Sequence, residues 1–533
     1  MADRSRPPRA GQGRIARNTA IFSIATGLSR FAGMGREVVA SSYFGTSGAF
    51  SAFTIAFQVP TLVRNLFADS ALSAAFVPVF TELLEKDKRK DAFMLATTFL
   101  AIIIGALGLL SVGFFFAAPY VMPLFTGKEF TEELDQLTIG LSQLLFPIVL
   151  LLGVNGLLVG ILMAYDHFTI PAISPLVWNL VIIATLVITV PMFEGDDQLY
   201  AYALGILLGT AVQLAMAIPI LRRLDFQWAK QISVRDPRVI RVLILMLPVT
   251  LGLGLINFNQ LISSLLASEV SEEAPRAIDA AFRIYMLPQG MFSVAIATVL
   301  FPTLSRLAAR RDYDDLRGLM GTGMRQIILL LVPSAVAVLV LAEPITRLVY
   351  ERGEFDADST ELVSQALFWF QFSLPFAGVN LLLTRTFFSL QKPWTPTVLA
   401  VGTLTINVVL ALLLYEPYGV PGIVVATAAA SAAMSVAQSW ALRGQLGGRL
   451  EGGQTLAATL KILVASAALG AASYGVWWAL DDLLGASLPA QLLSVGLGLA
   501  AGAAVYIILV RVLQIPEAQT IEKALRARIS RST

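Results

Sequence analysis

The sequence predicts an all-helical integral membrane protein. Of its 533 residues, 56% are hydrophobic and only 14% are charged, whereas soluble domains typically contain about 45–50% apolar and about 25% charged residues. Apolar runs of the roughly 20 residues that a helix needs to cross a bilayer recur from residue 18 to residue 513. No gap between these runs is long enough for a soluble domain. We therefore expect one membrane domain built from helices.

Fourteen transmembrane helices are predicted when the apolar runs are divided at their polar breaks. Several of them are longer than the bilayer is thick, so they must tilt, kink or protrude. The spans are 17–40, 49–82, 92–119, 136–164, 170–193, 198–221, 239–267, 276–306, 320–342, 359–390, 395–416, 420–443, 455–481 and 486–512.

The connecting segments alternate between basic and acidic composition. The N-terminal tail, "EKDKRK" after the second span and "KALRARISR" at the C-terminus are basic, whereas "GKEFTEELD", "FEGDD" and "ERGEFDADSTE" in the alternate loops are acidic. Basic segments next to membrane helices remain in the cytoplasm. Because the number of spans is even and both tails are basic, we expect both termini in the cytoplasm.

An internal repeat relates the fourth and tenth spans. Each contains Gly-Val-Asn followed by a proline at the same distance, since Gly153 and Pro171 are 18 residues apart, as are Gly378 and Pro396. A weaker likeness links the second and eighth spans. Both matches step by six helices, which predicts two six-helix lobes in a parallel pseudo-twofold repeat, two extra C-terminal helices and a central cavity between the lobes, as in many transporters.

The domain boundaries follow from this division. We expect a basic tail, an N-terminal lobe, a C-terminal lobe, the two extra helices and a second basic tail, at residues 1–16, 17–222, 239–446, 455–513 and 514–533.

Arginines within the apolar spans identify the candidate substrate site. Arg30, Arg36 and Glu37 lie in the first span, Arg64 in the second and Arg283 in the eighth. A charge inside a membrane costs at least about 2.5–3.5 kcal/mol, so it usually faces a cavity or a partner. The topology puts two of these arginines near mid-depth, Arg30 and Arg64, and the other two nearer the outer side. Because a guanidinium binds phosphate through two parallel hydrogen bonds, we expect the cavity to attract a phosphate-bearing anion.

Two further features bear on these arginines. Gly27, Gly33 and Gly35 are places where the first helix could bend, and a bend would direct Arg30 and Arg36 into one cavity. The structural alternative is local neutral pairing. It would join Arg36 to Glu37, Arg64 to Asp69, and Arg283 to Asp279 at the favourable i,i+4 spacing.

Catalysis and metal binding find little support in the sequence. There are no cysteines and only one histidine, and no nucleophile, phosphate-loop or paired acidic motif is present, so we expect no enzyme activity, no cofactor and no nucleic-acid partner. The acidic run "RDYDDLR" is interpreted as a solvated loop rather than a metal-diphosphate site. Isolated amides in the spans are interpreted as interhelical hydrogen-bonding groups, namely Gln143, Asn155, Gln260 and Asn380.

The stretch "SRFAGMGREVVASSYFGTSGAFSAFTIAFQVPTLVRNLFADSALSAAFVPVF", residues 29–80, is similar to the opening of the MurJ/MviN family. "GILMAYDHFTIPAISP" and "RTFFSLQKPWTP" extend the resemblance, which covers residues 17–450 approximately. The family comprises lipid II flippases of the multidrug/oligosaccharidyl-lipid/polysaccharide exporter superfamily.

The resemblance implies a flippase that moves undecaprenyl-diphosphate-linked peptidoglycan precursor from the inner to the outer leaflet of the bacterial cytoplasmic membrane by alternating access. It also implies a cationic cavity, whose residues fall on Arg30, Arg36, Glu37, Arg64 and Arg283. Lipid II and membrane lipids are then the expected partners, and cell-wall synthesis proteins are candidate partners.

Three positions depart from the family pattern. Ser51 and Met286 stand where many members carry Asp and Glu, and Thr61 stands in place of the usual Asn. The loss of two acids makes the cavity more basic, which leaves a flippase for another polyprenyl-linked glycan as the nearest alternative. A membrane scaffold that no longer transports is an alternative from another class. A drug exporter for cations is disfavoured by the excess of arginine, and a membrane transferase by the lack of a paired acidic motif.

Overall fold

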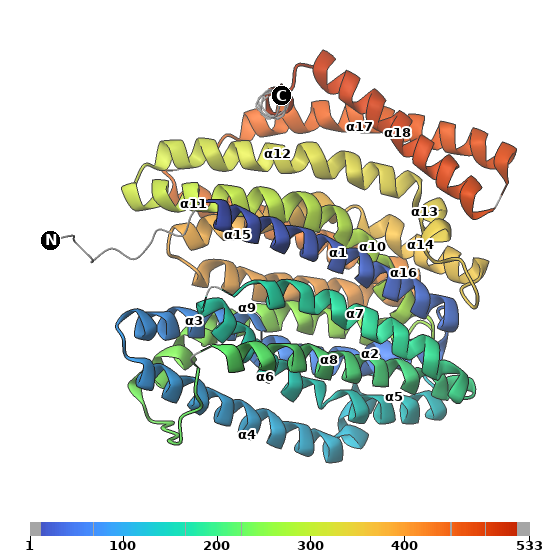
Figure 1. The fold of residues 1–533 in the computed structure, drawn as a ribbon. Helices are drawn as coiled ribbons and strands as arrows, with labels where there is room; N and C mark the ends of the chain where they lie inside the picture. The colour runs from blue at the N-terminus through green and yellow to red at the C-terminus, as the bar shows by residue number, and fades with distance from the viewer. Residues whose placement is uncertain are drawn as a thin grey trace. The chain divides into compact units, whose positions relative to one another are not determined.

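The computed structural model describes residues 12–67, 69–165, 167–224, 226–447, 450–485 and 487–519, and the regular elements among them are all helices (Figure 1). The chain divides into two compact units. Unit 1 holds the chain up to Leu261 except Gly45–Ser47, and unit 2 holds that turn and the chain from Ile262 onward. Most of the two predicted tails lies outside the described residues.

Unit 1 contains eight long helices and most of a ninth, joined by short 3₁₀ turns, over the residues that the structure describes. They are α1 (Gln12–Phe44), α2 (Gly48–Phe67), α3 (Asp69–Glu85), α4 (Arg89–Val121), η1 (Met122–Leu124), α5 (Glu132–Leu145), α6 (Ile148–Ala164), α7 (Thr169–Thr189), η2 (Val190–Met192), η3 (Gly195–Asp197), α8 (Gln198–Arg223) and α9 (Pro237–Ser268).

Close packing in unit 1 places α7 between α1 and α8. Gly209 makes the approach of α8 to α7 possible, because a Cβ added there would lie only 3.1 Å from the carbonyl oxygen of Trp178. Aromatic stacking joins α2 to α8, where the rings of Phe53 and Tyr202 are 4.6 Å apart. α1 is unbroken from Gln12 to Phe44.

Unit 2 contains the remaining helices. They are α10 (Ala274–Pro288), η4 (Gln289–Ser293, a π-helical turn), α11 (Val294–Arg310), α12 (Tyr313–Val340), α13 (Ala342–Tyr350), α14 (Ala357–Phe370), α15 (Leu374–Ser389), α16 (Trp394–Gln445), α17 (Gly452–Leu484) and α18 (Leu488–Val512). The short helix α13 was not expected from the sequence.

Several spans predicted as single helices are interrupted. The span 359–390 consists of α14 and α15, which meet at an angle of 48°. Pro375 occupies the first turn of α15, where its missing N–H is tolerated but where it would clash with the carbonyl of a continuing helix. The span 136–164 is divided between α5 and α6 in front of Ile148, with Pro147 as the N-cap. The span 276–306 is divided by the π-helical turn η4 directly after Pro288.

The predicted break between spans 395–416 and 420–443 is confirmed, because the segment labelled α16 is two helices that meet at a kink at Gly419. Asn407 of the first helix donates a 3.2 Å bond to Thr427 of the second. Gly419 leaves the helical conformation there, with φ 58° and ψ −136°. Flanking Pro417 and Pro421 remove two helical hydrogen-bond donors, and glycine adopts this backbone region without a Cβ clash.

The C-terminal helices α17 and α18 pack on each other, and both contact α12 in unit 2 (Figure 1). Tyr506 of α18 donates a hydrogen bond of 2.6 Å to the carbonyl of Leu329 in α12. Arg325 of α12 pairs with Glu451 at 2.7 Å and with Glu517. Near the other end of α17, Asp481 accepts a 2.5 Å bond from Arg347 of α13. Polar contacts therefore fasten this helix pair at both ends.

Candidate anion-binding site

Arg36 and Glu37 form a buried ion pair on α1. The two residues are only 8% and 3% exposed, and Arg36 Nη2 donates to Glu37 Oε1 at 2.7 Å. The Arg36 guanidinium also lies over the ring of Trp178, 4.9 Å from its centroid. Cation–π contact and ion pairing both restrict the guanidinium. The predicted local pair is confirmed, and the partner on α7 is an addition that the sequence did not indicate.

Trp178 is itself fixed by a hydrogen bond to a neighbouring helix. Its indole Nε1 donates to Thr210 Oγ1 of α8 at 3.0 Å, and Thr210 in turn donates to the carbonyl of Ile206 at 2.7 Å. The Arg36 side chain is thus oriented by contacts from α1 and α7, with α8 behind them. No local sequence pattern could have indicated Trp178, because it is 142 residues from Arg36 along the chain.

Arg30 and Arg64 occupy the other predicted positions in unit 1. Arg30 is exposed on α1, while Arg64 is half-buried in the last turn of α2. Asp69 begins α3, but its side chain lies outside the described part, so its pairing with Arg64 stays a prediction. α1 runs as one continuous helix through Gly27, Gly33 and Gly35, and the bend that would direct Arg30 and Arg36 into one cavity stays a prediction. Arg30 is exposed, whereas Arg36 is buried.

Arg283 lies on α10 in unit 2 and belongs to a group of three charges. Its Nε donates to Asp279 Oδ2 at 2.9 Å, which confirms the predicted i,i+4 pair. The same carboxylate oxygen accepts a 3.0 Å bond from Arg276, whose side chain is 1% exposed. Arg276 was not among the candidates, although its i,i+3 spacing to Asp279 is a signal that could have suggested it.

This chemistry suits the binding of an oxyanion. Guanidinium groups hold phosphate oxygens through charge-assisted, bidentate hydrogen bonds. Arg36 and Arg283 each have a carboxylate that restricts the side chain, while Arg30 adds an exposed positive charge in unit 1. Over the residues that the structure describes, no group of three or more His, Cys, Asp or Glu side chains is arranged to hold a metal ion.

The predicted interhelical amides have mixed outcomes. Gln143 donates to the carbonyl of Phe115 on α4 at 2.8 Å. Asn380 donates to Ser431 O at 2.9 Å and accepts from Ser435 Oγ at 2.7 Å. Both therefore bridge helices as expected. Asn155 is buried, but its Oδ1 has no hydrogen-bond partner among the described residues. For Gln260 the role stays a prediction.

The acidic run "RDYDDLR" has a structural role. Asp312 is the N-cap of α12 and accepts from the backbone N–H of Asp315 at 3.3 Å. Asp314 pairs with Arg317 on the same helix. These contacts use the carboxylates to start a helix. The run is therefore not the loop that the sequence suggested, because all of it from Tyr313 onward is part of α12.

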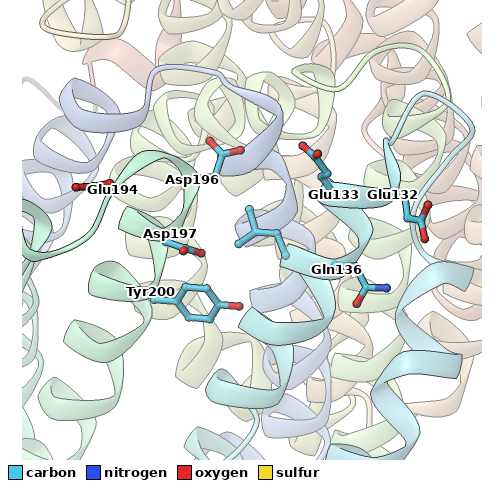
Figure 2. Close-up of a pocket in the computed structure, with 8 residues that line it drawn as sticks. Glu132, Glu133, Gln136, Glu194, Asp196, Asp197 and Tyr200 are labelled. Atoms are coloured by element: carbon cyan, nitrogen blue, oxygen red, sulfur yellow. The ribbon is translucent and has the colours of Figure 1, made fainter.

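An acidic cavity of about 610 Å³ lies elsewhere in unit 1. Figure 2 shows carboxylates from the first turn of α5 (Glu132, Glu133) around it, together with Asp196 and Asp197 from the turn η3 directly before α8. These residues belong to two of the acidic loops. The cavity carries the opposite charge from the arginines, so it is unsuited to an anionic substrate.

Comparison with known proteins connects this arrangement to a family. The family model described as "Lipid II flippase MurJ" matches residues 40–484. The lipid II flippase MurJ of Burkholderia cenocepacia is 29% identical over 385 residues, which cover 71% of this chain and 74% of that protein.

Solved structures agree on the fold. A structure of lipid II flippase MurJ in an inward closed conformation aligns with a TM-score of 0.75 and 23% identity, and covers 93% of this chain and 99% of that one. An inward-facing multidrug resistance transporter of the MATE family aligns with a TM-score of 0.69 and 15% identity, over 78% of this chain and 94% of that one.

The described residues include nine helices that are long and apolar enough to cross a membrane, and the bent pair α14–α15 would make a tenth. A multi-pass membrane protein with a MurJ- and MATE-like transporter fold follows from these helices and from the structural alignments. The family model covers more than four fifths of the chain, which confirms the resemblance seen in the sequence. The chain therefore belongs to the lipid II flippase MurJ family.

Proposed function

We propose that this protein moves lipid II from the inner to the outer leaflet of the bacterial cytoplasmic membrane. Membership of the MurJ family over residues 40–484 carries the proposal. The arginine chemistry agrees with it, because lipid II presents a diphosphate between its polyprenyl tail and its sugar–peptide headgroup. The protein would act as a transporter without catalysing a covalent step.

Arg30, Arg36, Arg64 and Arg283 would bind the diphosphate, and Glu37 would hold Arg36 in position. The buried Arg36–Glu37 pair supports this assignment, because a hydrophobic pair of similar size would be at least as stable in such a site. Trp178 contributes a second restraint on the same guanidinium. A restrained guanidinium loses less conformational entropy on binding an anion than a mobile one.

The full topology is part of the proposal: fourteen spans, two six-helix lobes over 17–222 and 239–446, two further helices over 455–513, and cytoplasmic termini. Packing around the repeated glycines supports the lobes. A Cβ at Gly153 would meet Leu107 and Ile103 of α4, and a Cβ at Gly378 would meet Leu331 and Ile327 of α12. In each lobe, the helix that carries the glycine packs on a helix that lies earlier in the chain. The sequence separation between the contacting residues is nearly the same in the two lobes.

The pairing of helices supports the repeat as well. α3 packs on α6 as α11 packs on α15, and α2 packs on α5 as α10 packs on α14. Under the proposal, transport proceeds by alternating access to a central cavity between the lobes, while the polyprenyl tail remains in the lipid. Membrane lipids and cell-wall synthesis proteins would be its other partners.

Growth of a bacterial strain depleted of its own lipid II flippase tests the function. The wild-type chain should restore growth, and Arg30→Gln and Arg64→Gln should not, since each removes a guanidinium from the proposed site. Arg317→Gln, in an exposed ion pair at the start of α12, is the matched control and should restore growth. Normal growth with both site variants, at wild-type protein levels, would contradict the assignment.

A parallel strain that lacks a flippase for a different polyprenyl-linked glycan tests the second candidate substrate. The loss of acids at Ser51 and Met286 favours this alternative over the other rivals. Ser51 is fully buried and Met286 is 49% exposed. If the protein rescues only that strain, the other polyprenyl-linked glycan is its substrate. If it rescues neither strain, the result favours a membrane scaffold that does not transport.

A further inference from the structure

Three charged side chains of α10 form a chain of contacts with graded exposure. The side chains of Arg276 and Asp279 are 1% and 9% exposed, and that of Arg283 is 32% exposed. One oxygen, Asp279 Oδ2, accepts from Arg276 Nη1 at 3.0 Å and from Arg283 Nε at 2.9 Å. The carboxylate therefore joins a deeply buried arginine to a more accessible one.

The charge of this group explains why it contains two arginines. An Asp279–Arg283 pair alone would be neutral and would attract an anion weakly. Arg276 adds a second positive charge at the same carboxylate oxygen, so the three side chains together carry a net charge of +1. Asp279 can then orient Arg283 while Arg276 offsets the negative charge of Asp279.

The guanidinium nitrogen that Asp279 contacts determines how Arg283 is oriented. Asp279 bonds to Nε, the guanidinium nitrogen nearest the aliphatic stem. A hydrogen bond at Nε fixes the plane of the guanidinium, and with it the direction of the terminal nitrogens that form the fork for a phosphate.

The helix that carries these charges is itself held by aromatic contacts. The ring of Tyr285 lies 5.6 Å from that of Phe282 and 5.3 Å from that of Phe370 on α14. Tyr350, which is fully buried, donates a 3.3 Å bond from its hydroxyl to the carbonyl of Ala280. With the backbone of α10 fixed, the aim of Arg283 depends mainly on its side-chain contacts.

We propose that Asp279 is a positioning residue for Arg283 and that Arg276 compensates the charge of Asp279, so that Arg283 can bind the diphosphate of the transported lipid. This proposal rests on the proposed function. It adds to that function two residues that do not themselves touch the substrate.

Substitutions that neutralise one charge at a time distinguish this role from simple structural support. Arg276→Gln lowers the net charge to zero and leaves Asp279 to neutralise Arg283, so substrate binding should weaken by about tenfold, the equivalent of one charge-assisted hydrogen bond. Asp279→Asn raises the net charge to +2, and this added charge should offset in binding what the poorer orientation of Arg283 costs, so the affinity should not fall. The maximal rate should fall because Arg283 loses its orientation. The double variant Arg276→Gln/Asp279→Asn returns to +1 and should regain most of the lost affinity.

Two measurements test these expectations. The first is flipping of fluorescent lipid II in phosphatidylcholine vesicles, with the half-saturating concentration and the maximal rate determined separately. The second is binding of undecaprenyl diphosphate to detergent-solubilised protein. Melting temperatures confirm that each variant is folded, Arg276→Lys tests rescue by a conserved charge, and Arg317→Gln is the control outside the site.

The results separate the two proposals. If wild-type protein does not flip lipid II but the binding series follows the predicted order, the substrate assignment fails while the charge relation stands. If wild-type protein flips lipid II and Arg276→Gln binds as tightly as wild type, the inference is wrong. Equal weakening in both single variants, without recovery in the double variant, would also overturn it, since a purely structural group has no dependence on the sign of the charge.

Discussion

Individual charged residues in the apolar part of the chain are held by specific partners. Arg36 and Glu37 are both at least nine-tenths buried, and removing such ions from water costs several kcal/mol each before pairing repays it. A buried pair is therefore weak evidence for stability. The contact of Arg36 with Trp178 adds restraint rather than neutralisation. Both features fit a residue retained for binding an anion.

A titration at the start of α10 gives a prediction at the same scale. Burial raises the pKa of Glu273 above its ordinary value of 4.5, and the nearby carboxylates of Asp356, Glu272 and Asp358 raise this pKa further. A raised pKa in the folded state means that ionisation of Glu273 costs no stability below pH 4.5, where the residue is protonated in both states, and that it destabilises the folded state as the pH rises through the folded-state pKa.

Glu273→Gln should accordingly raise the melting temperature at about pH 8 and change it little at about pH 4. The effect should be modest because solvent screens an exposed residue. Thermal unfolding of the detergent-solubilised protein at the two pH values measures it, with the exposed Glu129→Gln as a control. A stabilisation that is equal at both pH values would rule out the electrostatic explanation.

Single helices are shaped by proline and glycine at defined points. Pro375 coincides with the 48° bend between α14 and α15, and Gly419 supplies the non-helical residue within α16. The positions of proline and glycine can be read from the sequence. They do not show whether the helix bends, forms a π-helical turn or breaks completely there. The outcome depends on which neighbouring helix packs against the segment.

Gly419→Ala should destabilise the protein by about 1–3 kcal/mol, because φ 58° and ψ −136° lie in a backbone region that residues with a Cβ rarely adopt. Gly402→Ala is the matched control on the same helix, where an added Cβ would have no atom within 4 Å. It should be neutral or slightly stabilising, since alanine favours helix. Melting temperatures compare the two variants, and equal effects would show that Gly419 is not strained by a side chain.

At the scale of the whole molecule, α17 and α18 are fastened to unit 2 by contacts distant in sequence. Arg325 lies 126 residues from Glu451 and 192 from Glu517, and Tyr506 lies 177 residues from Leu329. Ion pairs at both ends of α17 and a hydrogen bond from α18 restrict sliding and rotation. We expect this helix pair to move with α12 and α13 as one body during transport.

A disulfide between α12 and α17 tests this expectation in a chain that contains no cysteines. An added Cβ at Gly470 would lie 2.9 Å from Val336 Cγ1, which brings the two Cβ atoms within the roughly 4.5 Å that a disulfide requires. Val336→Cys/Gly470→Cys should form the bond on oxidation and still flip lipid II, since no relative motion is blocked. The single-cysteine variants are controls, and flipping that is lost on oxidation and restored on reduction would show that α17 moves against α12.

The sequence by itself determined the helical membrane class, the charged positions and the family, because hydrophobic periodicity, charge spacing and motif order are local properties of the chain. The Arg36–Glu37 and Asp279–Arg283 pairs were predictable for the same reason, since their partners are one and four residues apart. Only the tertiary structure decided that Trp178 covers Arg36, that Arg325 reaches Glu451 and Glu517, and that α14 and α15 bend. These features depend on which helices meet, and helix packing is set by side-chain shape over the whole unit rather than by any short stretch of sequence.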